Sequence, residues 1–176
     1  MKLLFCMAAL AASLPAEIAD AGPGGFTIQQ TWTIKAASEE VYKRFMNNVG
    51  DWWSSGHTFS GDSHNLSIEP RINGCFCEKL PNNGGVRHLE IIYLVPGKTV
   101  RFSGALGPFQ SMGVSGVMTI QLKPAEGATQ LSLTYTVSGF MREAPRSLAA
   151  GADAMLKEQF TRFQHFAETG SPEEKK

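Results

Sequence analysis

Gln130-Leu-Ser-Leu-Thr-Tyr-Thr-Val-Ser-Gly139 decides the fold of this chain, because its apolar and polar side chains alternate without a break. A period of two predicts a strand with one buried face and one face in water. The segment Gly116–Lys123, immediately upstream, alternates in the same way. Because the turn-forming residues Pro124–Thr129 join the two segments, they predict an antiparallel pair of strands.

Similar strand signals, separated by Pro, Gly and Asn, extend upstream from this pair. The whole set is Phe26–Ile34, Asn65–Glu69, Gly74–Leu80, Val86–Val95, Lys98–Gly104, Gly116–Lys123 and Gln130–Gly139. Six of these segments follow one another directly, so they predict an antiparallel meander.

Helical signals lie on both sides of the meander. Ser38–Met46 has a good N-cap and an acidic first turn, and Val49–Trp53 predicts a short helical turn. Pro145–Glu168 has a broad apolar stripe and spans more than about 30 Å as a helix. The fold class is therefore α+β: a curved seven-stranded antiparallel sheet around a long C-terminal helix. The loop Asp51–Ser60 contains two adjacent tryptophans and is expected to cover a cavity.

The N-terminus resembles a secretory signal peptide, with Lys2, an apolar run and then small residues. We expect residues 1–21 to be removed, although a cut after Ala16 is also possible. The apolar run from Leu3 to Leu14 is much shorter than the roughly 20 residues of a membrane span, which disfavours a permanent anchor. A single domain over residues 26–168, a disordered tail over 169–176 and a periplasmic or secreted location are predicted.

Charge and cysteine content restrict the function further. Sixteen basic and sixteen acidic residues give a formal net charge of +0, so there is no electrostatic case for nucleic-acid binding. No motif predicts a cofactor, and nothing predicts the oligomeric state. Cys75 and Cys77 are expected to be two buried thiols, because residues i and i+2 of a strand lie about 6.5 Å apart at Cα with poorly aimed Cβ atoms.

A symmetric hairpin around Pro81–Gly85 would place Glu78 opposite His88 on the charged face of the strands. On that register the two residues form a surface ion pair. A slip of one residue would turn both side chains inward and make them a candidate acid and base.

The histidines and aspartates of the loop after the first helix contain enough donors for a metal. The candidates are Asp51, His57, Asp62 and His64, with Glu78 or His88 nearby. Their spacing fits no closed zinc pattern, so no metal site is predicted.

Two further features bear on a cavity. Gln30 lies on the apolar face of the first predicted strand, so its amide must find a hydrogen-bond partner or contact a ligand. The apolar connection Gly104–Gly113 could fold over one end of a cavity as a second gate, or simply pack on the core.

The order of elements and five segments resemble bacterial members of the START-like (SRPBCC) helix-grip superfamily. The segments are Val49–Trp53, His57–Gly61, Gly74–Glu78, Val86–Glu90 and Leu106–Gln110. The likeness covers residues 26–167. This superfamily includes polyketide cyclases and dehydratases, lipid carriers and the activator of the ninety-kilodalton heat-shock ATPase, so the resemblance implies a cavity without choosing a reaction. Export would make that chaperone an improbable partner.

Three hypotheses follow. The first is binding or carriage of a small hydrophobic or aromatic molecule between sheet and helix. The second is a cyclase-like or dehydratase-like enzyme in which His88 and Glu78 move a proton. The third is a stress-related interaction module with a filled core. The expected ligand-binding residues are Gln30, Trp32, Trp52, Trp53, Tyr93, Phe102, Phe109, Met118, Tyr135, Met155, Phe160 and Phe163.

Overall fold

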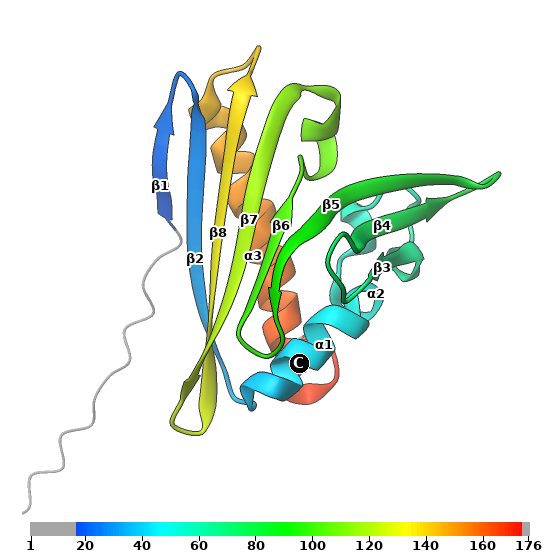
Figure 1. Cartoon of the computed structure of the whole chain (residues 1–176), viewed down its shortest axis with the longest axis vertical. Helices are drawn as coiled ribbons and strands as arrows, with labels where there is room; N and C mark the ends of the chain where they lie inside the picture. Colours follow the sequence, from blue (N-terminus) through cyan, green and yellow to red (C-terminus); the bar gives the residue numbers. More distant parts are fainter. Residues whose placement is uncertain (1–16, 174–176) are drawn as a thin grey trace, which may run out of the picture.

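The computed structural model describes residues 17–173. It is an α+β fold in which one antiparallel sheet packs against a long C-terminal helix (Figure 1). The strands are β1 (Glu17–Gly22), β2 (Gly25–Ile34), β3 (Leu66–Ile68), β4 (Cys75–Leu80), β5 (Gly84–Val95), β6 (Thr99–Ser103), β7 (Gly113–Ala125) and β8 (Ala128–Phe140). The helices are α1 (Ser38–Asn47), α2 (Val49–Trp52) and α3 (Pro145–Thr169), with single 3₁₀ turns η1 (Ser55–His57), η2 (Ser63–Asn65) and η3 (Gly107–Ser111).

The sheet has eight strands where the sequence predicts seven, in the order β1-β2-β8-β7-β6-β5-β4-β3. The additional strand is β1, which pairs with β2 through Ile18 opposite Ile28 and Ala21 opposite Phe26. It falls partly within the segment interpreted as a signal peptide. Residues 1–16 of that segment lie outside the described residues, whereas 17–21 belong to the sheet.

The predicted alternation is confirmed in β2, β7 and β8. In β8, Leu131, Leu133, Tyr135 and Val137 face the core, and all four are at most 1% exposed. Continuous pairing with β2 on one side and β7 on the other holds this register. Because β8 is central, every second residue meets side chains from both neighbours, which explains its regular pattern.

Helix α3 runs along the concave face of the sheet (Figure 1). Its buried stripe consists of Ala149, Ala152, Leu156, Gln159, Phe160, Phe163 and Ala167. The helix ends where Gly170 adopts a φ of 80° and donates its N–H to the carbonyl of Phe166 at 2.8 Å. A left-handed conformation at this position strongly favours glycine.

The segment after α3, which the sequence predicts as a disordered tail, includes one residue paired with the helix. Nη1 of Arg162 lies 2.8 Å from Oε1 of Glu173. Residues 174–176 lie outside the described part of the chain. Within residues 17–173, none of the helices combines the length and the hydropathy needed to cross a membrane.

The predicted register of the β4–β5 hairpin is wrong. Glu78 lies opposite Val86, not opposite His88, and a bulge between Phe76 and Cys77 leaves His88 as an extra residue of β5. Glu78 lies with Phe76 on the buried face of β4, and the bulge turns His88 inward beside Leu89, so the two side chains are only 1% and 5% exposed. A bulge reverses the face of every later residue in a strand, and no simple alternation reveals its position.

The prediction of two free thiols is also wrong, since Cys75 and Cys77 form a disulfide. Their Cα atoms lie 5.3 Å apart, closer than the roughly 6.5 Å of a regular strand. This separation lies within the usual range for a disulfide, so β4 is contracted between the two cysteines. Both cysteines are partly exposed on the outer face, whereas Phe76 between them is buried.

Candidate functional site

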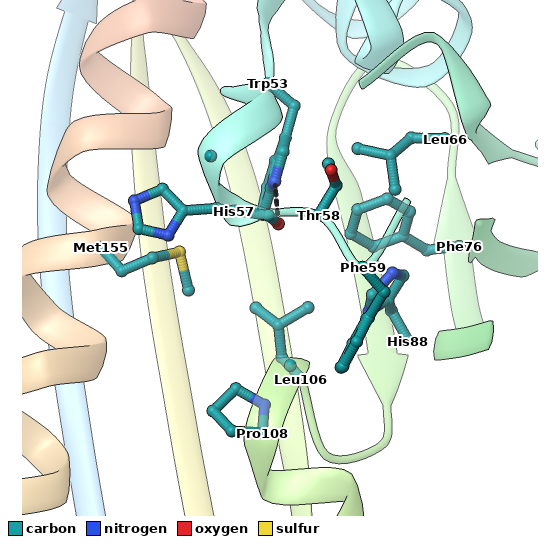
Figure 2. A pocket seen from close by; sticks show the side chains of 12 residues that line it. Trp53, His57, Thr58, Phe59, Leu66, Phe76, His88, Leu106, Pro108 and Met155 are labelled. Carbon is teal, nitrogen blue, oxygen red and sulfur yellow. Dashed lines mark hydrogen bonds between the residues drawn. The ribbon is translucent and has the colours of Figure 1, made fainter. Parts of the chain in front are cut away.

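An apolar cavity of about 240 Å³ opens between the loop after α2, the segment before η3 and the side of α3. In Figure 2, Trp53 closes one end, Leu106 and Pro108 the other, with Met155 and His57 facing Phe59, Phe76 and His88 across the gap. Its lining residues are Trp53, Gly56, His57, Thr58, Phe59, Leu66, Phe76, His88, Leu106, Gly107, Pro108 and Met155. A dry cavity of about 150 Å³ accepts benzene, so this one has room for a one- or two-ring compound.

The loop over the cavity is held by hydrogen bonds from buried groups. Nε1 of Trp53 donates to the carbonyl of His57 at 3.0 Å, and the backbone N–H of Ser54 donates to Oε1 of Gln159 on α3 at 2.7 Å. The rim is closed by an exposed contact of 3.1 Å between Nε2 of His57 and Oε2 of Glu158. The loop is therefore held firmly on its buried side and only weakly on its exposed side.

Glu78 organises the other wall. Its carboxylate accepts hydrogen bonds from the backbone N–H groups of Phe59, at 3.1 Å, and Ser60. Its Oε2 also lies 3.0 Å from Nε2 of His88. One buried carboxylate thus joins β4, β5 and the cavity loop, so its removal would affect all three.

The electrostatics of this pair follow from burial and hydrogen bonding. Burial raises the pKa of Glu78, but the hydrogen bonds from Ser60, Phe59 and His88 outweigh it and hold that pKa below its ordinary value. Burial lowers the pKa of His88, and the contact with Glu78 opposes this only in part. At neutral pH the pair is therefore a carboxylate and a neutral imidazole whose Nε2–H donates to Oε2.

This protonation state leaves Nδ1 of His88 as an acceptor. Nδ1 is buried and has no hydrogen-bond partner among the described residues. The imidazole packs between Phe59 and Phe76, with ring centroids at 5.9 Å and 5.1 Å. A buried acceptor without a partner costs free energy, and a ligand that donates a hydrogen bond would recover it.

We expect the free energy of unfolding to fall in two steps as the protein is acidified. The folded-state pKa of His88 lies below 6.5 and that of Glu78 below 4.5, so in both cases the unfolded chain binds the proton first. Stability should be complete above about pH 6.5, decline as the pH falls through the folded pKa of His88, and decline again below 4.5 as Glu78 protonates. Urea unfolding at a series of pH values between 8 and 4 measures the free energy of unfolding at each pH. In His88→Phe the first step should disappear; an unchanged profile would contradict the assignment.

The segment before η3 is tied to the sheet by Tyr135. Its hydroxyl accepts from the backbone N–H of Leu106 at 3.0 Å and donates to the carbonyl of Gly104 at 3.4 Å. Burial raises the pKa of Tyr135 to about 12, so the hydroxyl stays protonated and can serve both contacts. The predicted second gate thus forms one end of the cavity.

Tyr135→Phe should lower the free energy of unfolding by about 1–2 kcal/mol, because it leaves the buried N–H of Leu106 without an acceptor. It should also speed amide hydrogen exchange over residues 104–108. Tyr42→Phe, at a half-buried tyrosine on α1, is the control and should leave exchange in this segment unchanged. Equal exchange in both variants would show that the hydroxyl does not hold the segment.

The structure separates the predicted ligand-binding residues into groups. Trp53 and Met155 line the 240 Å³ cavity. Trp52, Phe102, Phe109, Met118, Tyr135, Phe160 and Phe163 are buried in the core, and Trp32 is half-buried against Phe160 at a centroid distance of 5.1 Å. The space between the sheet and α3 that contacts Trp52, Phe102 and Phe160 measures only about 10 Å³, room for one water at most.

Two predicted residues have other roles. Tyr93 was expected on the apolar wall but is 45% exposed, and the guanidinium of Arg101 lies 5.1 Å from its ring centroid. A second irregularity of β5, between Ile91 and Tyr93, turns it outward. Gln30 is buried and donates through Nε2 to the carbonyl and Oδ1 of Asp153 on α3, at 2.9 and 2.7 Å. The Nε2 of its amide is therefore paired within the fold, whereas Oε1 is buried and has no hydrogen-bond partner among the described residues.

Several cavity residues were not predicted individually, namely Leu66, Phe76, Leu106 and Phe59. The first two lie on the short strands β3 and β4, where three to six residues carry too little alternation to identify the buried face. Leu106 lies in the predicted gate, and Phe59 in the predicted cavity loop. The apolar character of those two loops was the available signal.

The predicted metal candidates do not converge. Asp62 contacts His64 at 2.9 Å, whereas His57 contacts Glu158. Between residues 17 and 173 there is no group of three His, Cys, Asp or Glu side chains arranged to hold a metal ion.

Comparison with known proteins identifies the fold. No protein-family model and no curated protein matches this chain. A conserved protein of unknown function, EF2215 from Enterococcus faecalis, superposes with a TM-score of 0.62 at 15% identity, covering 92% of this chain and 82% of that one. The Aha1 dimer from Colwellia psychrerythraea gives 0.58 at 20% identity, covering 82% and 97%.

A third similar structure is DynU16, a putative protein in the dynemicin biosynthetic locus, with a TM-score of 0.58 at 17% identity. The match covers 83% of this chain and 48% of DynU16, so this chain matches about half of that protein. These likenesses establish a helix-grip-like fold. At such identities they say nothing about activity.

Proposed function

We propose that this protein binds a small, largely apolar molecule carrying one hydrogen-bond donor, in the cavity beside His88. The observation that carries the proposal is an apolar space of about 240 Å³ lined in part by His88, whose buried Nδ1 has no hydrogen-bond partner among the described residues. Most of the lining is apolar, which favours an aromatic or aliphatic body. Nδ1 of His88, an acceptor without a partner among the described residues, favours a hydroxyl at one position once Phe59 has moved aside.

The site differs from the one expected between sheet and helix. The aromatic side chains there fill the core, and the cavity lies at the open end formed by the two loops. Phe59, which is 57% exposed and packs on His88, is placed to move aside as a ligand enters. The similar solved structures show the fold alone, so the proposal rests on the cavity of this chain.

A matched pair of probes tests the proposal. Calorimetric titration should show 2-naphthol binding about tenfold more tightly than naphthalene, since one hydrogen bond to a buried acceptor contributes about 1 kcal/mol or somewhat more. His88→Phe should abolish this preference while retaining naphthalene binding. Native mass spectrometry of the protein from its own source would identify a natural ligand. Failure of both probes to bind, with a ligand-free native mass, would favour an interaction module instead.

A second candidate function, proton transfer, is supported by the inward-facing pair. A carboxylate that orients an imidazole in a water-poor cavity is a known arrangement for a general base. Solvent deuterium exchange at the α-carbon of 2-tetralone, followed by NMR, tests it. Exchange should be accelerated by the native protein and lost in His88→Gln. Exchange that is equal with and without protein would exclude this role for the compound.

We also propose export, with cleavage after Ala16 in preference to Ala21. A cut after Ala21 would remove most of β1, whose Ile18 and Ala21 pack against the core. A cut after Ala16 would leave the whole strand. Intact-mass measurement of the protein from a periplasmic extract distinguishes an N-terminus at Glu17 from one at Gly22, and an uncleaved mass would reject export.

A further inference from the structure

We propose that the Cys75–Cys77 disulfide is a thiol-exchange site that reacts with a low-molecular-mass thiol. The bond lies on the outer face of β4, and both cysteines are partly exposed. An incoming thiolate can therefore reach it without unfolding of the protein.

The position of the bond argues against a mainly stabilising role. It encloses a single intervening residue, Phe76. In the chain-entropy account a disulfide stabilises by restricting the unfolded chain, and the restriction grows with the length of the closed loop. A ring this small restricts very little of the unfolded chain, so stabilisation of the fold is not the main effect of the bond.

The opposite strand makes the two sulfurs unequal. Cys77 lies opposite Arg87, and Cys75 lies opposite Glu90. Directly opposed side chains share a face, with Cβ atoms about 5 Å apart. The cation of Arg87 favours a thiolate at Cys77, whereas the carboxylate of Glu90 disfavours one at Cys75. The ion pair of 2.7 Å between Arg87 and Glu90 keeps both charges at this position.

The charges assign a role to each cysteine. The external thiolate attacks Sγ of Cys75, the Cys75–Cys77 bond breaks, and Cys77 leaves as a thiolate beside Arg87. A second external thiolate then attacks the sulfur of the first one in the mixed disulfide and releases Cys75. Two external thiols are oxidised to one disulfide, and the protein disulfide is reduced to a dithiol.

Exchange at this bond is linked to the cavity through β4 and β5. Phe76, between the cysteines, packs 5.1 Å from the His88 ring and 5.4 Å from the Trp53 ring, centroid to centroid. His88 is the extra residue of β5 at the bulge, and it lies opposite the step from Phe76 to Cys77 on β4. Reduction allows β4 to lengthen toward the regular spacing of about 6.5 Å, which loosens the bulge and its contacts.

The first experiment treats the folded, oxidised protein with glutathione, stops the reaction with acid and locates the mixed disulfide by peptide mass spectrometry. The adduct is expected on Cys75. Arg87→Gln should slow its formation several-fold. Arg71→Gln is the matched control, because Arg71 is similarly exposed and also pairs with a glutamate, at 2.7 Å from Glu69. An adduct on Cys77, or none without denaturant, would overturn the proposal, as would equal rates in the two variants.

The second experiment measures amide hydrogen exchange over residues 86–91 before and after reduction. Faster exchange in the reduced protein is expected, and unchanged exchange would overturn the link to the cavity. Neither experiment uses a cavity ligand, so both results are independent of the binding and proton-transfer proposals.

Discussion

Glu78→Ala is expected to lower the free energy of unfolding by about 3–5 kcal/mol, because three donors lose one acceptor and an unmade hydrogen bond at a buried group costs about 1–3 kcal/mol. The glutamate side chain is 0% exposed and accepts from Phe59, Ser60 and His88. Its loss leaves these three donors without this acceptor. Because two of them belong to the cavity loop, the variant should also lose naphthol binding before it loses the fold. Urea unfolding and calorimetric titration measure the two effects.

Glu158→Ala is the control for this variant. Glu158 holds the same loop from outside through His57, but its side chain is 48% exposed. A surface pair of this kind contributes at most about 1 kcal/mol. If the two glutamate variants were equally stable, the inner carboxylate would not be what positions the loop.

Phe160→Ala is expected to destabilise the protein by about 3–5 kcal/mol, the range for phenylalanine truncation in a packed core. Phe160 is 2% exposed, and its ring centroid lies 5.1 Å from Trp32, 6.0 Å from Phe45 and 6.0 Å from Trp52. The surrounding rings belong to β2, α1 and α2, so they cannot collapse together into the space. Thermal or urea unfolding provides the measurement.

Met155→Ala, five residues earlier on α3, separates packing from ligand contact. Met155 is partly exposed and lines the 240 Å³ cavity, so its truncation should cost only about 1 kcal/mol of stability. Its effect should appear in probe affinity instead. A large loss of naphthalene affinity in a folded Phe160→Ala protein, with none in Met155→Ala, would place the ligand in the core and contradict the site described above.

The candidate site shows where sequence patterns stop being informative. The cavity loop and the gate could be recognised because each carries apolar side chains in a turn-rich segment. The orientation of Glu78 and His88 could not. Glu78 shares the buried face of β4 with Phe76, and either face of this short strand carries apolar or sulfur-containing side chains. His88 turns inward because of one extra residue in β5, and a bulge leaves no compositional signal.

The core aromatics show a different limit. Trp52, Phe102 and Phe160 have the composition of a ligand pocket, yet they pack against one another and leave about 10 Å³. Composition states which side chains are apolar. Whether they fill a space or surround it depends on how the elements approach, which is a property of close packing in three dimensions.

The sequence by itself determined the order of elements, the alternation of β2, β7 and β8, and the apolar stripe of α3, because these follow from local periodicity. Only the tertiary structure decided the eighth strand, the inward turn of Glu78 and His88, the Cys75–Cys77 bond and the position of the cavity. Each of these depends on contacts between segments distant in the chain or on a local irregularity of pairing. The contacts that stabilise these features form only in the assembled sheet and helices, so the sequence of one segment does not reveal them.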